Sequence, residues 1–529
     1  MRIRVLSVLP AILLLTTATA AAPDGVTQAA RALDALVAHA EGAKPLSKED
    51  AARHIRTVQT AVHNLPLDDT RLRPRLAELR EQHADDLVPT AKRPLKRSNV
   101  LGRLLMGIDL DRLGRLPAHE VKAHPAAAAF PGAVPAGDPR VRRTLTIDTA
   151  TPGWHSTGLY AAPGEVVTVT APASAVGTDL FVRIGCHQDG LWRLDAWKRP
   201  PAICHHFRLS ATETRAASAF GGPVYVEVPR GCTLGHVKVV LAGAVEMPYY
   251  VHGRTDPAAW RQSIRQRPAP WAELASEKII LTVPARVVRD LDDPAAVMTF
   301  WDAVADACAD LSARPRDRDR PERYVADVQI SAGYMHSGYP IMTLLDMPPV
   351  MVDVDRLKRN AHGGVWGLFH ELGHNHQARD WTFRGTVEVT VNLFTMYVFE
   401  TVCGLEPTRC HGSISDRSRA RKMRAYLADP NFATWQRDPF LGLIMYIQMQ
   451  KAFGWDAFKK VFAEYRALKK AERPRSDDAK RDQWLVRFSR TVGRDLGPFF
   501  AAWHVPVSDA AREKIAALPD WMPEGFPPK

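Results

Sequence analysis

The stretch AHGGVWGLFHELGHNHQARDWTFRGTVEVTVNLFTMYVFE, residues 361–400, decides the fold of this sequence and the chemistry that it can carry. Its centre is an H-E-x-x-H motif at residues 370–374, and the apolar residues just before the motif predict a helix. On a helix, His370 and His374 project from one face, one turn apart, so both imidazoles can bind a single Zn²⁺ ion. Glu371 lies beside them, where it can act as a base.

A catalytic zinc ion needs a third protein ligand and an open coordination position. Glu388, fourteen residues after His374, lies in a stretch whose apolar spacing predicts a second helix. Glu400 lies in the same stretch, twelve residues further along the chain. At about 1.5 Å per helical residue the two carboxylates are about 18 Å apart, so only one of them can bind the ion. The spacing alone does not choose between them.

The motif also has simpler explanations. An H-E-x-x-H sequence arises by chance in roughly a few chains of this size in a hundred, and glutamate is a common residue. A second histidine pair, His119 and His124, illustrates a pattern without a site. These two residues are five positions apart, which splays them on a helix, and they adjoin a proline-rich stretch. We interpret that pair as part of the surface.

The composition excludes several classes of protein. The 529 residues include 70 Lys and Arg against 58 Asp and Glu, a formal charge of +12, but the excess is spread along the chain, so we expect no nucleic-acid partner. Residues 1–20 combine two arginines, an apolar run and an A-x-A cleavage site. This pattern is typical of a Sec signal peptide and predicts a secreted or periplasmic protein. No other apolar stretch is long enough to span a bilayer, and we expect a monomer without a transmembrane anchor.

The hydrophobic pattern changes along the chain and predicts a multidomain α+β protein. Apolar residues recur with helical spacing in the N-terminal region, then alternate as in short strands, and return to helical spacing around the H-E-x-x-H motif. Before the motif strands and helices mix, and one strand is predicted at residues 348–355. The predicted divisions are a signal peptide (1–20), a helical N-terminal region (21–122), a Pro/Ala linker (123–139), a β-sandwich domain (140–250), a mainly helical catalytic domain (251–515) and a C-terminal tail (516–529).

Six cysteines are too few for a disulfide-built scaffold. Cys403 and Cys410 bracket a short loop after the second predicted helix and are close enough in sequence to form a local disulfide. Six cysteines permit fifteen pairings, and the sequence does not choose among them. No C-x-x-C sequence occurs, which argues against a cysteine zinc site.

The residues around the motif resemble a known family. HELGHNHQ, followed by W-x-F-x-G-T-x-E-V-T-x-N, is similar to the peptidase M60 family, the enhancin-like gluzincins. The similarity includes WHSTGLYAAPGEVVTV upstream and PFFAAWHVPVS downstream, and it runs from about residue 140 to residue 506. One departure is His504, where the family pattern has a glycine.

The resemblance implies a gluzincin catalytic domain in a secreted zinc endopeptidase that degrades mucins and related O-glycoproteins. His370, His374 and Glu388 match the family's ligands for one zinc ion, and the pattern G-T-x-E-V-T thereby selects Glu388 over Glu400. Glu371 matches the glutamate that activates zinc-bound water. Some animal members of the family have lost the H-E-x-x-H motif and act as binding proteins.

Four further residues are candidates for contact with the substrate or with the ligands. Tyr339 lies before the motif helix, where related zincins keep a strand that lines the substrate cleft. Trp381 can stack on a sugar, although a tryptophan among apolar neighbours is more often core. Asn392 is one turn after Glu388 and can orient a ligand, while His376 lies off the ligand face. The donor that stabilises the oxyanion stays open among six residues: Tyr334, His336, Tyr339, Tyr397, His411 and His504.

Two other functions are compatible with the same residues. One is a general metallopeptidase that has no requirement for a glycan. The other is a non-catalytic protein that binds carbohydrate or a surface through its β-sandwich and uses the metal only for structure. Glu371 argues against the second function, because a structural zinc ion has no use for that carboxylate.

Overall fold

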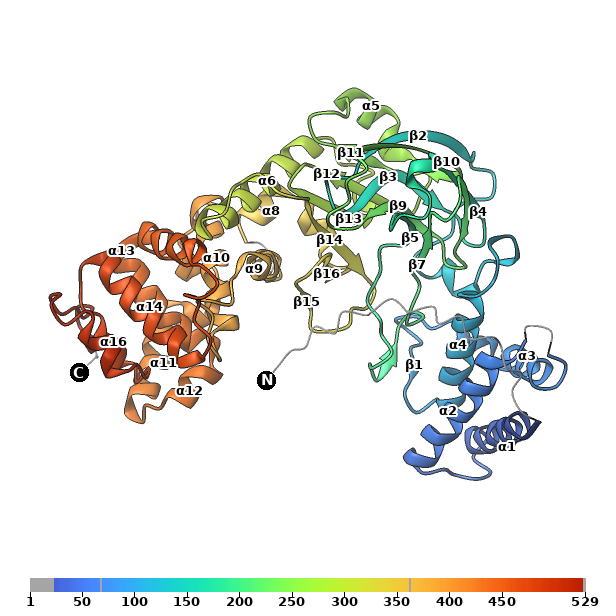
Figure 1. Cartoon of the computed structure of the whole chain (residues 1–529), viewed down its shortest axis with the longest axis horizontal. Coiled ribbons are helices and arrows are strands. Elements are labelled where there is room, and N and C mark those ends of the chain that lie inside the picture. The colour runs from blue at the N-terminus through green and yellow to red at the C-terminus, as the bar shows by residue number, and fades with distance from the viewer. Residues whose placement is uncertain (1–22, 67–68, 361–362, 527–529) are drawn as a thin grey trace.

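The computed structural model of the chain describes residues 23–66, 69–360 and 363–526 (Figure 1). The predicted signal peptide at residues 1–20 lies outside these ranges. In Figure 1 the chain runs from a group of helices at one end, through a β-rich centre, to a helical lobe at the other end. Within the described ranges, no helix combines the length and the apolar character needed to cross a bilayer.

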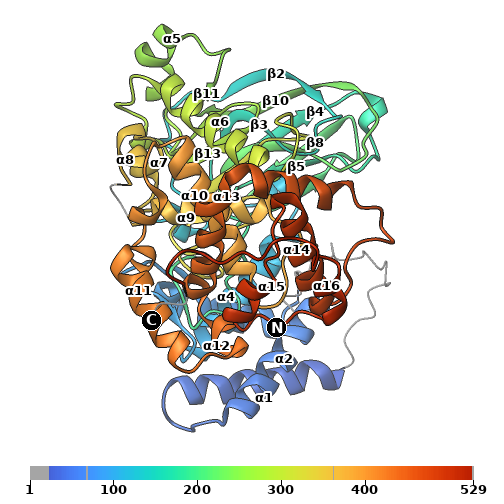
Figure 2. The same ribbon diagram turned by 90° about the vertical axis from the view of Figure 1, so that its left-hand side faces the viewer.

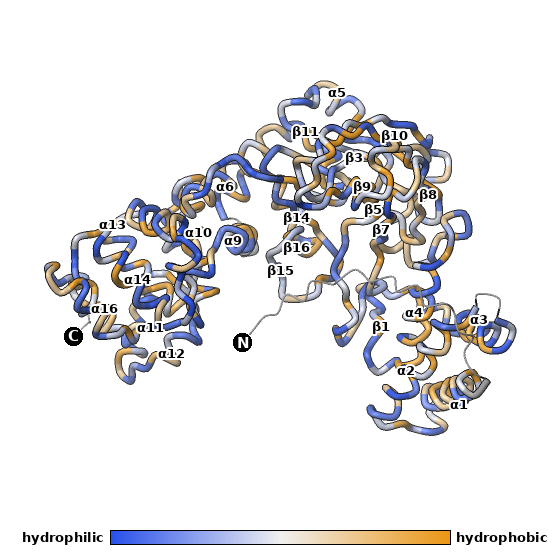
Figure 3. Tube along the Cα trace, in the orientation of Figure 1, coloured by the Kyte–Doolittle hydropathy of each residue, from blue (hydrophilic) through white to orange (hydrophobic). Residues whose placement is uncertain are grey.

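The N-terminal region is helical, as the sequence predicts. Its helices are α1 (Pro23–Ala40), α2 (Lys48–Asn64), α3 (Leu72–Gln82) and α4 (Val100–Leu113). Figure 3 shows apolar residues along α1 and α4, and these faces form a small core of their own. Leu191 and Trp197, from a later part of the chain, enter this core. A short strand, β1 (Leu95–Lys96), pairs with β6 (Ala196–Trp197), so the helices are fastened to the β-rich centre.

Residues 123–139 pack against both neighbouring regions. Phe130 is buried in an apolar cluster, and the indole of Trp271 donates a hydrogen bond of 2.8 Å to the carbonyl of Pro131. His124 is buried as well, with Nε2 3.2 Å from a carboxylate oxygen of buried Asp109. Our interpretation of His124 as a surface residue was wrong. The residue lies outside a helix, where its ring caps the short 3-10 turn that follows it.

The next region is built from antiparallel strands. They are β2 (Val141–Asp148), β3 (Gly153–Ala161), β4 (Val166–Thr170), β5 (Phe181–Ile184), β7 (His205–Arg208), β8 (Glu213–Ala217), β9 (Gly222–Val228) and β10 (His236–Glu246). Up to Ala242, β10 pairs with β2 and β4. Beyond Gly243, Ala244 still pairs with β2, and Val245 and Glu246 pair with β3. Gly243 has a φ of +93°, which a glycine adopts without strain and which allows the strand to bend there. The two layers of the predicted β-sandwich are therefore halves of one folded sheet, and they enclose a shared core.

A second sheet supports the helical lobe. Its strands, in spatial order, are β11 (Tyr249–Val251), β12 (Trp271–Ala275), β13 (Ile279–Pro284), β14 (Glu322–Asp327), β16 (Ile341–Leu344) and β15 (Met335–His336). The edge strand β15 runs antiparallel to β16. An edge strand leaves one side of its backbone unpaired, which is where an extended peptide can bind.

The helices of the second half of the chain enclose the largest apolar core, and most of them form the lobe (Figure 1). They are α5 (Pro257–Gln262), α6 (Pro294–Leu311), α7 (Pro348–Met351), α8 (Val354–Lys358), α9 (Val365–His376), α10 (Val387–Thr401), α11 (Asp416–Ala428), α12 (Phe432–Arg437), α13 (Pro439–Ala467), α14 (Asp477–Val492), α15 (Gly497–Ala502) and α16 (Asp509–Glu513). Figure 2 shows α13, α14 and α16 gathered in one lobe. Phe526, in the predicted tail, is buried in the same core. His504 has a φ of +52°, which explains why the family pattern has a glycine there.

The strand predicted at residues 348–355 is wrong. Pro348 occupies the first turn of α7, where its missing N–H costs nothing, and the carboxylate of Asp353 caps α8 by accepting from the N–H of Arg356. These start signals outweigh the β-branched residues between them, which on their own favour a strand.

Two fully buried ion pairs hold the β-rich centre against the second sheet. Arg323 of β14 pairs with Glu273 and donates hydrogen bonds of 3.0 Å to the Trp154 carbonyl and to the Ser156 hydroxyl of β3. Arg199 donates two hydrogen bonds, of 2.9 and 2.7 Å, to the carboxylate of Asp327 at the end of β14. Each pair compensates charges that would otherwise be buried alone.

Breaking one of these pairs should destabilise the protein strongly. Arg199→Leu leaves Asp327 buried without its partner and should lower the free energy of unfolding by about 3–5 kcal/mol, measured by denaturant titration. The matched control is Arg208→Leu, whose partner Asp179 has a side chain that is 70% exposed, so a loss of at most about 1 kcal/mol is expected. Equal losses in the two variants would contradict this prediction.

Candidate metal centre

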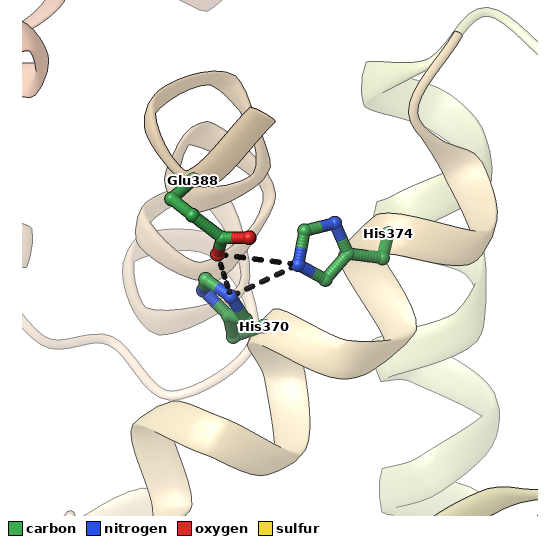
Figure 4. A group of neighbouring side chains, drawn as sticks. All are labelled: His370, His374 and Glu388. Atoms are coloured by element: carbon green, nitrogen blue, oxygen red, sulfur yellow. Dashed lines mark hydrogen bonds and ion pairs between the residues drawn. The ribbon is translucent and has the colours of Figure 1, made fainter. Parts of the chain in front are cut away.

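Helices α9 and α10 bring together the three side chains that the sequence nominates as metal ligands (Figure 4). His370 and His374 project from one face of α9, and Glu388 reaches them from the first turn of α10. The Nε2 atoms of the two histidines are 3.1 Å apart. The nearer carboxylate oxygen of Glu388 lies 3.0 Å from Nε2 of His370 and 3.4 Å from Nε2 of His374.

This triangle has the size that a zinc ion requires. Three donors on a tetrahedral Zn²⁺, each at about 2.0–2.1 Å, are about 3.3 Å from one another, and the three observed separations lie on either side of that value. Within the described residues, this is the one cluster of histidine, cysteine and carboxylate side chains found to converge in this way. The donor set, two imidazoles and one carboxylate, is one that zinc uses in catalytic sites.

The far side of the His370 ring is held by Asn392. The amide oxygen of Asn392 accepts a hydrogen bond of 3.1 Å from the indole N–H of Trp366, and its nitrogen donates to the Glu388 carbonyl at 2.7 Å. The same oxygen lies 2.7 Å from Nδ1 of His370, so Nδ1 must carry the proton. In the neutral ring, the Nε2 atom of His370 therefore presents a lone pair to the centre of the triangle.

Gln377 fixes His374 in the same way. Its amide nitrogen donates to the Val387 carbonyl at 2.8 Å and to the Thr390 hydroxyl, which leaves its oxygen as the acceptor for Nδ1 of His374 at 3.1 Å. Gln377 is not among the site residues predicted from the sequence. It lies three residues after the second ligand, at the end of α9, and that spacing is the signal that could have found it.

These contacts leave three acceptor atoms facing one another. With both Nδ1 atoms protonated, the neutral imidazoles of His370 and His374 offer only lone pairs to the Glu388 carboxylate. A shared metal ion satisfies all three lone pairs. Without an ion, a proton on Nε2 of either histidine can instead form a hydrogen bond with the Glu388 carboxylate, at separations of 3.0 and 3.4 Å. The residues therefore fit a bound divalent metal ion.

Glu371 lies one residue after the first ligand and is half buried. Burial raises the pKa of Glu371 above its ordinary value, although the nearby histidines His370 and His374 act in the opposite direction. Hydrogen bonds with the same histidines hold the pKa of Glu388 well below its ordinary value. The two carboxylates thus differ in character: Glu388 stays ionised as a ligand, while Glu371 is closer to the range of a base that exchanges protons.

Two adjoining family models match the chain. The N-terminal domain of M60-like peptidases matches residues 137–242, and peptidase M60, enhancin and enhancin-like, matches residues 243–504, which include the whole metal centre. The chain belongs to the M60 peptidase family. The resemblance that the sequence analysis describes is therefore confirmed.

Vertebrate proteins are similar in sequence to this M60 chain. TRPM8 channel-associated factor 2 from Homo sapiens is 40% identical over 386 residues, which cover 72% of this chain and 41% of that protein. The chain thus spans about two fifths of the length of the curated relatives it matches.

Solved structures share the fold of the M60 chain. A functionally unknown conserved protein from Bacillus anthracis str. Ames has a TM-score of 0.59 at 24% identity, with 72% of this chain and 80% of that chain covered. The IMPa metallopeptidase from Pseudomonas aeruginosa has a TM-score of 0.56 at 18% identity, with 94% and 62% covered. IMPa has also been solved with T-antigen and with an O-glycopeptide.

The remaining candidates from the sequence lie away from the metal centre of this M60 protein. Trp381 is buried against Phe462, with ring centroids 4.3 Å apart, so of the two roles open to it from the sequence it has that of a core residue and not that of a sugar platform. His376 is also buried; its Nε2 accepts from Arg318 at 2.9 Å, and burial lowers its pKa to about 3. A neutral histidine in these contacts has a structural role.

Tyr339 follows the edge strand β15, as expected, but its hydroxyl is directed away from the ligands. It accepts a hydrogen bond of 3.1 Å from the backbone N–H of Trp154 in β3. The guanidinium of Arg320 lies 3.4 Å from the centre of its ring. The hydroxyl of Tyr339 therefore joins the two sheets.

Cys403 and Cys410 are not bonded to each other, so the disulfide predicted between them is wrong. Cys410 directly follows a short 3-10 turn, and its thiol donates a hydrogen bond of 3.4 Å to the carbonyl of Glu406. That contact turns the sulfur toward its own turn. All six cysteines lie within the described ranges and are free thiols.

Among the six residues considered for stabilising the oxyanion, His336 of β15 has contacts that favour its charged form. Its Nε2 lies 2.7 Å from the carboxylate of Asp189, and its Nδ1 lies 3.1 Å from the carbonyl of Ser337. Burial opposes its charge, but the hydrogen bond and the charge of Asp189, together with the Ser337 carbonyl and the charge of Glu371, outweigh burial and raise the pKa of His336. The charge of His336 acts on Glu371. Tyr397, another of the six residues, is buried beside Trp455.

Glu400, the alternative ligand, lies far along α10 and accepts a hydrogen bond of 2.7 Å from the indole of Trp455. Glu388 and Glu400 are both exposed carboxylates on one helix, so each is the control for the other. We expect Glu388→Ala to lose bound zinc after dialysis, because two imidazoles hold the ion loosely. Glu400→Ala should keep the wild-type zinc content, measured by plasma mass spectrometry. Zinc lost from Glu400→Ala but kept in Glu388→Ala would show that Glu400 is the third ligand.

The glycine of the H-E-x-x-H motif is required by the packing of α9 on α10. A Cβ atom on Gly373 would lie 2.9 Å from Cβ of Phe394 and 3.0 Å from a methyl carbon of Val391. We expect Gly373→Ala to push the helices apart, cost about 1–3 kcal/mol of stability, and weaken zinc retention, because the Glu388 carboxylate moves with α10. Gly363→Ala, where the new methyl group has no neighbour within 4 Å, is the control. Wild-type zinc retention in Gly373→Ala would refute the argument.

Proposed function

We propose that this chain is a zinc-dependent endopeptidase that hydrolyses peptide bonds in mucin-type O-glycoproteins. The observation that supports it best is the convergence of His370, His374 and Glu388 beside Glu371. Among the described residues, none forms a hydrogen bond or an ion pair with the Glu371 carboxylate. A carboxylate kept free next to a metal centre serves chemistry better than structure.

The roles of the residues follow from their contacts. His370, His374 and Glu388 would hold the ion, which when bound lowers the pKa of a water molecule and polarises the scissile carbonyl. Glu371 accepts a proton from the attacking water, because its raised pKa brings it closer to the working pH. It then delivers that proton to the leaving amine.

His336 contributes a positive charge to the same site. Both of its ring nitrogens face acceptors, Asp189 and the Ser337 carbonyl, so the protonated ring is the form that these contacts favour. Its charge acts on Glu371 and favours the build-up of negative charge during the attack on the carbonyl. Because β15 is an edge strand, a substrate backbone that pairs with it would lie next to His336.

The substrate class is supported by family membership and by the complexes of a structural relative. IMPa, which shares the fold, was solved with an O-glycopeptide. The alternatives are a peptidase without a glycan requirement and a binding protein, the latter favoured by the vertebrate relatives that are named for their association with a channel. The free carboxylate of Glu371 favours an enzyme over a binding protein.

The catalytic role predicts the behaviour of one isosteric variant. Glu371→Gln should lower the rate of peptide release from a defined O-glycoprotein by about 10²–10⁴-fold, while its zinc content stays at the wild-type level because Glu371 is not a ligand. Peptides are identified by mass spectrometry, which also reports the cleavage positions. Unchanged proteolysis would remove Glu371 from the mechanism.

Glycan dependence separates the two enzymatic functions. The same O-glycoprotein is digested before and after enzymatic removal of its O-glycans. A rate that falls at least about tenfold on deglycosylation corresponds to about 1.4 kcal/mol of glycan recognition and supports the proposal. Equal rates support a general metallopeptidase.

A further inference from the structure

A cavity lies beside the far end of α9, between the helical lobe and the β-rich centre. Its volume is about 510 Å³. It is lined by the segment that connects α6 to β14, by Tyr339 after the edge strand, and by Asn375, the residue that follows the ligand His374. Arg230, in the turn after β9, completes it from the other side. Cavities between domains are preferred places for ligand binding.

The basic and the acidic residues of this cavity differ in how deeply they are buried. Arg314, Arg318 and Arg320 are half buried in its wall, whereas the acidic residues of the same segment, Asp317 and Asp319, are exposed. Asp317 and Asp319 also line the cavity, and Asp319 lies 3.8 Å from Arg230. Within the described residues neither aspartate forms an ion pair with Arg314, Arg318 or Arg320, so the inner surface is cationic. Such an arrangement attracts an anion into the cavity rather than neutralising the guanidinium groups in place.

One inner carboxylate, Glu322, is already engaged. Arg318 lies 3.6 Å from one of its oxygens, and the amide nitrogen of Asn375 donates to the other at 3.0 Å. The Nε atom of Arg318 is buried and, among the described residues, has no hydrogen-bond partner. A buried donor without an acceptor costs free energy, and an anion in the cavity is one way to satisfy it.

Arg314 and Arg320 lack carboxylate partners altogether within the described ranges. Arg314 donates a hydrogen bond of 3.0 Å to the Asn375 carbonyl, and burial lowers its pKa, as expected for a guanidinium that has lost hydration. Arg320 lies over the ring of Tyr339. Each guanidinium keeps N–H groups free for a planar or tetrahedral oxyanion, which arginine binds with paired hydrogen bonds.

We propose that this cavity binds an anionic group of the substrate, a carboxylate or a sulfate, through Arg314 and Arg320. The proposal rests on the proposed function, because the cavity adjoins the metal centre through Asn375 and would act on a substrate held there. It adds a preference for charged substrates, either an acidic glycan or an acidic stretch of the peptide.

Binding is measured by calorimetry in the Glu371→Gln background, so that the substrate is not consumed. Three probes share one peptide sequence: a glycopeptide with the neutral T-antigen, the same glycopeptide with a sialylated T-antigen, and the neutral glycopeptide with one added aspartate. We expect at least one charged probe to bind about tenfold more tightly than the neutral one. The charged probe that gains affinity identifies the source of the anion.

The variants Arg314→Gln and Arg320→Gln should each remove most of that gain while leaving the affinity for the neutral glycopeptide unchanged, which also shows that they are folded. Arg31→Gln, which removes one exposed charge from α1, should keep the full gain. Equal affinities for all three probes, or a gain that persists in both cavity variants, would overturn the proposal. Failure of the wild-type protein to cleave the neutral glycopeptide would instead contradict the proposed function.

Discussion

The close approach of α9 and α10 at Gly373 is the constraint on which the metal centre depends. A hydrogen atom in place of a side chain lets Phe394 and Val391 of α10 pack directly on the backbone of α9. That contact sets how far Glu388 stands from the two histidines. The amide of Asn392 then links the helices a second time, since it touches His370 on one side and the Glu388 carbonyl on the other. Geometry and protonation state are thus fixed by the same helix pair.

The β-rich centre contributes to the cleft as well as to stability. Asp189, which lies in the M60-like N-terminal segment, pairs with His336 on the edge strand of the second sheet. Arg199, from the same part of the chain, holds the end of β14 through Asp327. A residue far from the motif in sequence therefore sets the charge beside Glu371. Positions that look structural in one half of the chain tune the chemistry of the other.

The local part of the site could be predicted from the sequence, because helical periodicity alone places His370 and His374 on one face. Glu388 needed the family pattern, since spacing left Glu400 open. Asn392 was found because it lies one turn from Glu388, but Gln377 and Asp189 were missed. Gln377 acts from the end of α9, where side-chain direction depends on how the helix ends, and Asp189 is brought to His336 by tertiary folding.

The fold was predicted in outline, and the errors have local causes. Residues 348–355 read as a strand because β-branched residues dominate them, yet the caps at Pro348 and Asp353 start two helices. The disulfide predicted at Cys410 was wrong for a different reason, and the same reason left two roles open for Trp381. Neither the burial of a ring nor the direction of a thiol within a turn is visible in a one-dimensional pattern.

The bend of β10 has a consequence for how the protein is divided. The two family models meet between residues 242 and 243, which is inside that strand, at the glycine where it passes from one half of the folded sheet to the other. The boundary is therefore a shared piece of backbone rather than a joint between two bodies. A fragment cut there would lose a continuous strand on both sides and would expose the halves of the Arg199–Asp327 pair. Because a strand and a buried ion pair cross the boundary, we expect the two family segments to unfold together as one cooperative unit.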